Sequence, residues 1–558
     1  MTQPTPPPVA HTPRQPPPSW VSRTAEAAAG WWKNGTWRFT PRAARRLQWS
    51  AIAAVTLLAA AVRLWNLGHP GVLVFDEIYY VRDSYSQLLN GFPTKWAEGL
   101  GMNFGPNEIT QSLPTASYVV HPPLGKWLIG LGMLVCDADN GWGWRMSTAV
   151  AGTLAVLLVT VLGRRLFRST LIGVIAGFLM AIDGLAIVMS RVSLLDNFLM
   201  LAALLGAYFV LLDRDQNDRV WQRWLRATPH RGDYGPVLWR RPWLLAASIT
   251  FGLAAGIKWS GLYVLAGFGL YLVIRDMYQR RKAGLVGWFS AGVLTQGLVS
   301  FALLVPLALA SYLATWTGWL LTSTGWNRGW AAEAGNAATG FFSWVPHWAQ
   351  SLWHYHTTMY QWHSTLNAPH PYMAHPLTWP LALRPTSMYY ESFEYGQDGC
   401  TISKCSEAIT SLPNPLIWWG GLLALGFLAY LLVRYRDGVA GFILVGALSG
   451  YLPWLLTPSR SAVFQFYTIA YAPFVYLALA YAVGWILGYW RLDQGYGKFF
   501  GTISRRHPLP RITTPNLTVV AIFLVTALAV SIYFYPLWTG TRISFTFWQL
   551  HIWLPGWS

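Results

Sequence analysis

Two adjacent carboxylates, Asp76 and Glu77, follow the first long apolar segment of the chain. Apolar residues flank them on both sides, at positions 72–75 and 78–80. Ionisable side chains are costly to hold beside a membrane, and those found there are functional candidates by default. One carboxylate could act as a general base toward an attacking hydroxyl while its neighbour orients it or holds a cation. The alternative is a pair of solvated loop residues, the commoner fate of Asp-Glu in a soluble protein.

A second motif, residues 121–126, reads His-Pro-Pro-Leu-Gly-Lys. The two prolines fix an extended entry, after which a helix begins. Residues 123–135 are predicted to form an amphipathic helix that lies in the membrane interface. Lys126, one turn into that helix, could hold a lipid phosphate as a point charge. The alternative is that Lys126 extends its charge to the membrane surface and only anchors the helix.

Basic residues also stand at the outer ends of several predicted membrane spans. With Lys126 they form a set of cations that faces one side of the membrane: Arg63, Lys126, Arg191, Lys258 and Arg460. Each one alone is explained by helix capping or membrane anchoring. As a cluster they favour an anionic ligand such as a phosphodiester.

The segment 190–197 joins the outer ends of two consecutive predicted spans. Arg191 and Asp196 lie in it, and one alternative is that they pair with each other. Asp183 lies deeper in the preceding predicted span and has no obvious partner. Ionisable residues this close to a membrane are candidates for function.

The long segment 311–415 is rich in Trp, His, Tyr and Pro. Its histidines would permit a metal site, but their spacing is a weak signal and we predict no metal. Cys400 and Cys405 lie in this segment, where a disulfide could persist if it is outside the cytoplasm. The chain has no Walker lysine loop and no Rossmann glycine pattern, so a nucleotide cofactor is not expected.

The composition predicts a polytopic membrane protein. Of the 558 residues, 54% are hydrophobic and only 11% are charged. A soluble protein has about 25% charged residues. The net charge of +18 does not indicate nucleic acid, because most Lys and Arg cluster in short segments between spans, as the positive-inside rule requires.

We predict about eleven transmembrane helices in an all-α protein. They fall at 48–67, 143–163, 170–190, 194–212, 242–257, 259–275, 286–310, 416–433, 438–456, 463–488 and 514–536. Residues 1–45 are Pro-rich and then basic, which predicts a disordered cytoplasmic tail. Residues 1–20 lack the apolar core of a cleavable signal peptide.

The predicted organisation then has three further parts. Residues 46–310 form an N-terminal transmembrane module whose first loop, about 68–142, holds the acidic pair. Residues 311–415 form a long extracytoplasmic loop, and residues 416–558 supply the C-terminal helices. The distribution of basic residues places the N-terminus in the cytoplasm and both large loops outside, in a plasma membrane.

Several motifs in this order resemble one known family, the protein O-mannosyltransferases of glycosyltransferase family 39. In the transmembrane part they are Arg63, Phe75-Asp76-Glu77, the motif 121–126, the segment 190–196 and Gly256-Ile257-Lys258-Trp259-Ser260-Gly261. In the long loop they are His370-Pro371-Tyr372, Trp379-Pro380-Leu381, Arg384-Pro385 and Asn414-Pro415. The Pro-rich tail and the lack of a β-trefoil insert resemble the bacterial, actinobacterial-type members.

The resemblance implies a GT-C fold and an enzyme without a metal. Mannose would pass from a polyprenyl-phosphate-mannose donor to Ser or Thr of a protein that emerges through the Sec channel, with inversion at the anomeric carbon. Asp76 matches the general base and Glu77 the neighbour that shapes the acceptor site. Arg63, Arg191 and Lys126 match positions associated with lipid phosphate binding or active-site structure. We assign residues to the donor phosphate (Arg63, Lys126, Arg191, Lys258, Arg460) and to substrate binding (His121, Asp196, Arg384). Near Arg460 the chain reads Phe464-Gln465-Phe466-Tyr467 where relatives often have His-Tyr.

Two other functions remain open from the residues. Another lipid-linked GT-C transferase, of aminoarabinose onto lipid A or arabinose onto a cell-wall glycan, would share an early acidic residue and an interfacial helix. A membrane transporter would place ionisable residues at mid-membrane and show inverted repeats or broken helices. Here the charges gather at one face, which favours an enzyme.

Overall fold

The computed structural model describes residues 40–228, 232–457, 460–493, 502–504 and 512–558. The chain separates into two compact units, Met1–Ala53 and Ala54–Ser558. Most of the predicted tail, residues 1–39, lies outside the described residues. Its last positions were predicted wrongly, because helix α2 (Pro41–Leu64) already begins at residue 41. The four-part division of the chain stays a prediction.

Each predicted span falls on a helix. Among the described residues, seven helical stretches are long and apolar enough to cross a membrane, namely Arg42–Leu64 within α2, α5 (Gly141–Phe167), α8 (Leu195–Ala227), Trp288–Ala314, α15 (Pro415–Tyr435), α16 (Gly438–Leu455) and α18 (Thr514–Thr539). A bent pair, α6 (Thr170–Ile182) and α7 (Gly184–Arg191), makes an eighth. The other predicted spans are α9 (Pro242–Ile257), α10 (Gly261–Lys282) and α17 (Ala472–Ile486). The chain is therefore a multi-pass membrane protein, and the count of eleven stays a prediction.

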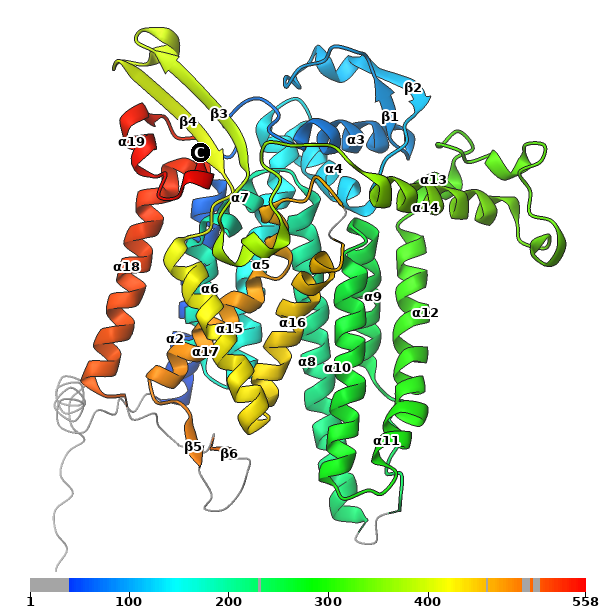
Figure 1. Cartoon of the computed structure of the whole chain (residues 1–558), viewed down its shortest axis with the longest axis vertical. Coiled ribbons are helices and arrows are strands. Elements are labelled where there is room, and N and C mark those ends of the chain that lie inside the picture. The colour runs from blue at the N-terminus through cyan, green and yellow to red at the C-terminus, as the bar shows by residue number, and fades with distance from the viewer. Residues whose placement is uncertain (1–39, 229–231, 458–459, 494–501, 505–511) are drawn as a thin grey trace, which may run out of the picture. The chain divides into compact units, whose positions relative to one another are not determined.

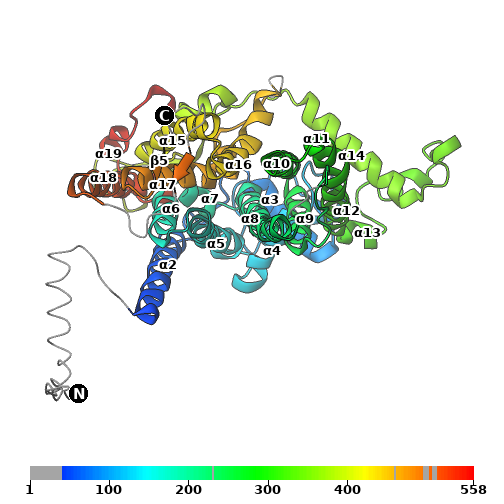
Figure 2. The ribbon, with the colours of Figure 1, turned by 90° about the horizontal axis from the view of Figure 1, so that it is seen from below.

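The long helices pack in two adjoining groups (Figures 1 and 2). Helix α9 contacts α8, α10 and α12 (Leu298–Ala314), while α15, α16 and α17 contact one another. Contacts of α10 with α16, and of α5 with both α6 and α8, join the groups. Small residues permit this close packing, since a methyl group at Gly252 would meet the carbonyl oxygen of Ala308 at 2.2 Å.

The bend between α6 and α7 measures 60° and centres on Asp183. Asp183 accepts hydrogen bonds from the backbone of Ala186 at 3.3 Å and of Asn414 at 2.9 Å, and from the Tyr476 hydroxyl at 2.8 Å. A break in a buried helix frees backbone groups that must be satisfied internally. Asp183 accepts hydrogen bonds from such groups, and its partners are ones that were not obvious from the sequence.

Asn414 and Pro415 begin α15. The Asn414 side chain accepts from the backbone of Leu416 and Ile417, and its amide donates to the Ala527 carbonyl and Ser531 hydroxyl of α18 at 2.8 Å. Asparagine is a strong N-cap and proline is favoured at the first helical position. The Asn-Pro motif thus fixes where α15 begins and bonds that end of α15 to α18.

Shorter elements lie across one end of the long helices (Figure 1). They include α3 (Glu77–Asn90), α4 (Leu124–Cys136) and α14 (His347–Thr365). Helix α4 matches the predicted interfacial helix 123–135 to within one residue at each end.

The predicted long loop also contains a β-hairpin, which the all-α prediction missed. Strands β3 (Ser387–Glu394) and β4 (Lys404–Thr410) pair antiparallel, and β7 (Ile543–Ser544) extends the sheet in the order β3–β4–β7. Cys400 and Cys405 form a disulfide near the hairpin turn. A second small sheet joins β1 (Thr94–Trp96) to β2 (Ser112–Ala116), and β5 (Arg491–Asp493) pairs with β6 (Thr502–Ser504). The protein is mostly helical all the same.

We predict that Asp183→Ala lowers the free energy of unfolding by about 2–4 kcal/mol, because buried donors lose a charged acceptor. The apparent thermal midpoint in detergent measures the loss. Asp215→Ala is the matched control, since Asp215 pairs with Arg165 and both side chains are about one-third exposed; such pairs contribute about 1 kcal/mol at most. Equal midpoints for the two variants would contradict the role of Asp183.

Candidate active site

Asp76 lies at the start of α3, immediately after a backbone turn. The turn is set by Phe75, whose φ of 49° is left-handed. The Asp76 carboxylate is partly exposed and accepts no hydrogen bond from the described residues. Burial raises the pKa of Asp76 from 3.8 to about 6, while the charge of Lys258 opposes the rise and that of Asp196 adds to it. This is a carboxylate with accessible oxygens that can accept a proton near neutral pH.

The charge of Lys258 acts on Asp76, and Lys258 itself is held by two other groups. Its Nζ contacts the Asp196 carboxylate oxygens at 2.9 and 3.0 Å and stands 4.0 Å from the centre of the Tyr467 ring. Lys258 ends α9, Asp196 is in the first turn of α8, and Tyr467 lies in the 3-10 turn Gln465–Ala470. Asp196 therefore pairs with Lys258, and the alternative of a pair with Arg191 was wrong.

Two histidines, His121 and His363, lie together on another side of the site. The rings of His121 and His363 are 5.2 Å apart, and His363 contacts the Val120 carbonyl at 2.9 Å. Burial, together with the charges of Lys258 and His363, holds the pKa of His121 well below 6.5. Burial likewise lowers the pKa of His363 to about 4. Both rings are thus neutral at pH 7, so they can donate or accept a hydrogen bond without adding charge.

Arg460 lies next to the histidines. Its charge lowers the pKa values of both His121 and His363. Its guanidinium stands 5.6 Å from the centre of the Trp454 ring, and its buried Nε has no hydrogen-bond partner within the part of the chain that the structure describes. A guanidinium with spare donors is suited to an anionic oxygen.

Glu77 points away from Asp76 and is fully buried. It accepts two hydrogen bonds from Arg145, at 2.9 and 2.8 Å, and one each from the backbone N–H groups of Val74 and Ser193. Arg145 also donates to the carbonyls of residues 67, 70 and 72. This pair holds the loop that carries Asp76 against α5 and against the junction of α7 and α8.

Arg145 was not among the residues predicted from the sequence. The signal was present, because residue 145 lies inside the predicted span 143–163 and a charge inside a span is a candidate for function or pairing. Glu77 was predicted to shape the acceptor site. In the structure its hydrogen bonds all go to groups of the protein interior, so it positions the loop that carries Asp76, and its predicted effect on the acceptor site stays a prediction.

Arg63 and Arg191 occupy helix ends. Arg63 is fully buried and donates to Ser190 Oγ and to the carbonyls of residues 59, 180 and 181, which include those freed at the α6–α7 bend. Arg191 donates to the carbonyls of residues 63, 65 and 66 at the end of α2. Backbone carbonyls thus hold both guanidinium groups, and their assignment to the donor phosphate stays a prediction.

Lys126 and Arg384 also have protein partners. Lys126 is buried, donates to the His121 carbonyl at 3.0 Å and lies 3.8 Å from the Asp83 carboxylate. It therefore positions the backbone of His121. Arg384 donates to the Pro371 carbonyl and stands over the Tyr372 ring. Within the described part of the chain, no hydrogen bond or ion pair joins Arg384 to the residues around Asp76.

The residues around Asp76 form a site that can accept a proton on a carboxylate and bind an anionic group nearby. It combines one accessible carboxylate, a lysine paired with an aspartate, two neutral imidazoles and one guanidinium with unused donors. Among the described residues, no group of three or more His, Cys, Asp or Glu side chains could hold a metal ion.

We predict that Glu77→Ala lowers the free energy of unfolding by about 3–5 kcal/mol, since Arg145 would be left as an unpaired buried charge. Thermal unfolding in detergent checks this, with Asp76→Ala as the neighbouring control that should unfold near the wild-type midpoint. Replacing both partners, as Glu77→Leu with Arg145→Met, should recover most of the loss. A double variant as unstable as Glu77→Ala would contradict the pairing.

Comparison with known proteins places this site in a family. The family model described as dolichyl-phosphate-mannose-protein mannosyltransferase matches residues 53–229, and that of the C-terminal four-transmembrane region of protein-O-mannosyltransferase matches residues 348–557. The chain is similar to the polyprenol-phosphate-mannose–protein mannosyltransferase of Mycolicibacterium smegmatis, with 35% identity over 91% of this chain and 93% of that one. The enzyme of the same name from Corynebacterium glutamicum is 29% identical over 91% and 93%.

The fold agrees with this relationship. One chain of the Saccharomyces cerevisiae protein O-mannosyltransferase Pmt1-Pmt2 complex, solved with the sugar donor bound, superposes with a TM-score of 0.66. The alignment covers 92% of this chain and 93% of the yeast chain at 15% identity, so it shows the shared GT-C fold. The matches extend over most of the chain, so this chain belongs to the family of polyprenyl-phosphate-mannose–protein mannosyltransferases.

Proposed function

We propose that this chain transfers mannose from a polyprenyl-phosphate-mannose donor to a Ser or Thr hydroxyl of a protein, with Asp76 as the general base. The observation that carries the proposal is the accessible Asp76 carboxylate, which has a raised pKa and is acted on by the charge of Lys258, in a chain of this family. A donor whose leaving group is phosphate needs little acid catalysis. The protein must then deprotonate the hydroxyl and stabilise the leaving phosphate.

The step proceeds as one displacement. The acceptor oxygen attacks the anomeric carbon, its proton passes to Asp76, and the bond from that carbon to the phosphate oxygen breaks with its electrons. Polyprenyl phosphate leaves with one more negative charge than it had in the donor. Attack from the face opposite the phosphate inverts the configuration, from a β-linked donor to an α-linked product.

Arg460 and Lys258 are the cations that we assign to the phosphate. Arg460 has an unused buried donor, and the charge of Lys258 acts on Asp76. His121 and His363 complete this side as neutral hydrogen-bonding groups. Three other cations act indirectly in this proposal, because their hydrogen bonds to backbone carbonyls fix the helix ends and the loop that carry the site. They are Arg63, Arg191 and Lys126.

The site faces the extracytoplasmic side in this proposal. Segments at the opposite ends of the long helices are rich in Arg and Lys, including the last turns of α5 and α10. That asymmetry supports a cytoplasmic N-terminus in a bacterial plasma membrane. An acceptor on the outer face would meet the enzyme as it emerges from the Sec translocon, with its Ser- and Thr-rich segments still unfolded.

We predict that Asp76→Asn lowers kcat for mannose transfer by about 100-fold or more, with an unchanged thermal midpoint. The amide has nearly the shape of the carboxylate but cannot take the proton. The assay uses synthetic polyprenyl-phosphate-mannose, a Ser/Thr-rich peptide and enzyme in detergent. Transfer at close to the wild-type rate would exclude Asp76 as the base.

The rate should also depend on pH with the sign that Asp76 dictates. The base form is the carboxylate, which predominates above its pKa of about 6. Initial rates at saturating donor should therefore fall as the pH drops through about 6, whereas an ordinary aspartate would give a flat profile there. A flat profile between about pH 5 and 8 would contradict this tuning.

We predict that Arg460→Met raises the KM for the donor about tenfold, since one charge-assisted hydrogen bond to phosphate is lost. Arg384→Met is the comparison variant, and its donor KM should change less than about threefold because its guanidinium binds the Pro371 carbonyl. Steady-state kinetics with varied donor distinguish the two. An effect at Arg384 and none at Arg460 would contradict this assignment and would place the phosphate near Arg384 instead.

A further inference from the structure

We propose that a phospholipid with an anionic headgroup binds in a cavity at those ends of the long helices that lie away from Asp76. The cavity has a volume of about 1180 Å³, and α8, α10 and the junction of α15 with α16 line most of it. Helix α10 begins three residues after Lys258 and ends at Lys282, which lines the cavity. The cavity and the candidate active site therefore lie at opposite ends of α10, and the inference goes beyond the proposed function.

One side of the cavity is apolar and belongs to the lipid-facing surface of the helices. Four aliphatic side chains line it, on α10 and at the end of α15, and all four are exposed on the protein: Leu270, Ile274, Leu432 and Val433. In a membrane such side chains are covered by hydrocarbon chains. An occupant that fills the whole cavity must therefore be amphiphilic, with an acyl chain against this wall.

The other side of the cavity has an excess of positive charge. Its charged residues are five cations and three carboxylates, with a formal charge of +2: Arg168, Arg214, Arg275, Lys282 and Arg436 against Asp215, Asp218 and Asp437. The positive-inside rule explains basic residues at this end of the spans. It does not explain why cations from α8, from α10 and from the ends of α5 and α15 meet at one cavity. Basic pockets between helices on the cytoplasmic side bind anionic lipid headgroups, and the assignment to that leaflet rests on the orientation proposed above.

The three carboxylates leave part of this positive charge unpaired. Each carboxylate accepts hydrogen bonds from protein groups, which are Arg165 for Asp215, Arg275 and Gln279 for Asp218, and Tyr481 and the Val439 backbone for Asp437. The side chains of Arg168 and Lys282 are exposed and take part in no hydrogen bond or ion pair among the described residues. These two cations can contact the oxygens of a phosphate without breaking an existing pair.

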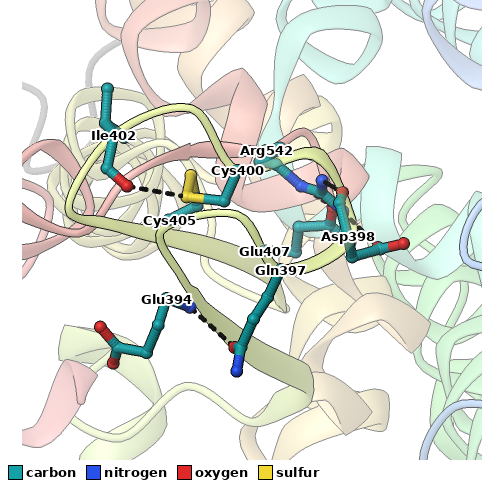
Figure 3. Close-up of a disulfide and its surroundings, with 8 residues drawn as sticks. All are labelled: Glu394, Gln397, Asp398, Cys400, Ile402, Cys405, Glu407 and Arg542. Carbon is teal, nitrogen blue, oxygen red and sulfur yellow. Dashed lines mark hydrogen bonds and ion pairs between the residues drawn. A yellow bond between two sulfur atoms is a disulfide. The ribbon is translucent and has the colours of Figure 1, made fainter.

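The charge of this cavity distinguishes it from a second cavity, of about 530 Å³, beside the β3–β4 hairpin. The charged and titratable residues that line the second cavity are Glu391, Asp398, Glu407, Arg542 and His69. Figure 3 shows Arg542 beside Asp398 and Glu407, which it contacts at 2.8 and 2.7 Å. Three carboxylates against one arginine disfavour an anion there, so charge favours the cavity between α8, α10 and the α15–α16 junction.

A lipid in this cavity would contact both groups of long helices. Helices α8 and α10 belong to one group, and α15 and α16 belong to the other. A ligand that binds the folded protein and not the unfolded chain stabilises the folded state. The bound lipid would therefore stabilise the packing of the two groups against each other, remote from mannose transfer.

Thermal unfolding of the full-length protein in a nonionic detergent tests the proposal. Phosphatidylglycerol is the anionic probe, and phosphatidylcholine with the same acyl chains is the zwitterionic control. We expect the apparent midpoint to rise with phosphatidylglycerol and to follow the concentration dependence of a single site, which gives a Kd. Phosphatidylcholine should leave the midpoint within about 1 °C of its value without lipid. Equal shifts with the two lipids would overturn the proposal.

Charge variants locate the headgroup. Arg168→Gln combined with Lys282→Gln removes the two unpaired cations and should raise the Kd for phosphatidylglycerol about tenfold or more. Arg223→Gln combined with Arg226→Gln is the matched control, because it makes the same change of charge at exposed residues of α8 that do not line the cavity. The control should change the Kd less than about threefold. Equal weakening by both pairs would indicate general attraction to a basic surface and would overturn the proposed site.

A neutral variant tests whether the lipid occupies the cavity itself. Gly438 lines the cavity, and a Cβ placed there has no heavy atom within 4 Å. Gly438→Trp should therefore unfold near the wild-type midpoint without lipid and raise the Kd for phosphatidylglycerol about tenfold, because the indole fills the space. Inorganic phosphate, added in a parallel series, distinguishes a lipid from a free anion. Stabilisation by phosphate equal to that by phosphatidylglycerol, or a wild-type Kd for Gly438→Trp, would overturn lipid binding in this cavity.

Discussion

The buried pair of Glu77 and Arg145 is the constraint on which the site depends. Their side chains are 0% and 1% exposed, and removing either charge from such a pair is far more costly than a surface pair would suggest. The other lone pairs of the Glu77 carboxylate and the other N–H groups of Arg145 bond to the backbone of the loop before α3 and of the junction before α8. The pair therefore sets where the loop turns and which way its next residue faces.

That geometry divides two adjacent carboxylates between two tasks. Consecutive residues at a helix start point in different directions, so Glu77 fills the interior while Asp76 faces the partly open site. The same division applies to the cations. Arg63 and Arg191 bond the carbonyls that helix breaks leave free, whereas Arg460 retains an unused donor. The two arginines that bond free backbone carbonyls therefore hold the structure, whereas the arginine with a free donor is the one that the proposed function assigns to the phosphate.

Hydropathy predicted the positions of the helices well, because each span is an uninterrupted apolar segment whose backbone must bond to itself in lipid. It also brought Asp76, Lys258 and His121 to one side. Hydropathy could not predict which charged residues pair. Lys258 and Asp196 are 62 residues apart in the chain, and only the packing of α8 against α9 brings them together. The β3–β4 hairpin was missed for a related reason, since the segment 311–415 was predicted only as a long loop and strand pairing within it depends on contacts that hydropathy does not report.

The arrangement of charge also bears on how the proposed step avoids a large electrostatic cost. The donor phosphodiester and the Asp76 carboxylate each carry one negative charge before reaction. When the hydroxyl proton reaches Asp76, that charge disappears as the leaving phosphate gains one, so the total is conserved and negative charge moves toward Arg460 and Lys258. Asp196 offsets much of the charge of Lys258, which keeps Asp76 from being held too strongly in its ionised form. Burial raises the pKa of Asp76 to about 6 against the opposing charge of Lys258, and a base with that pKa can both accept the proton and release it after each turnover.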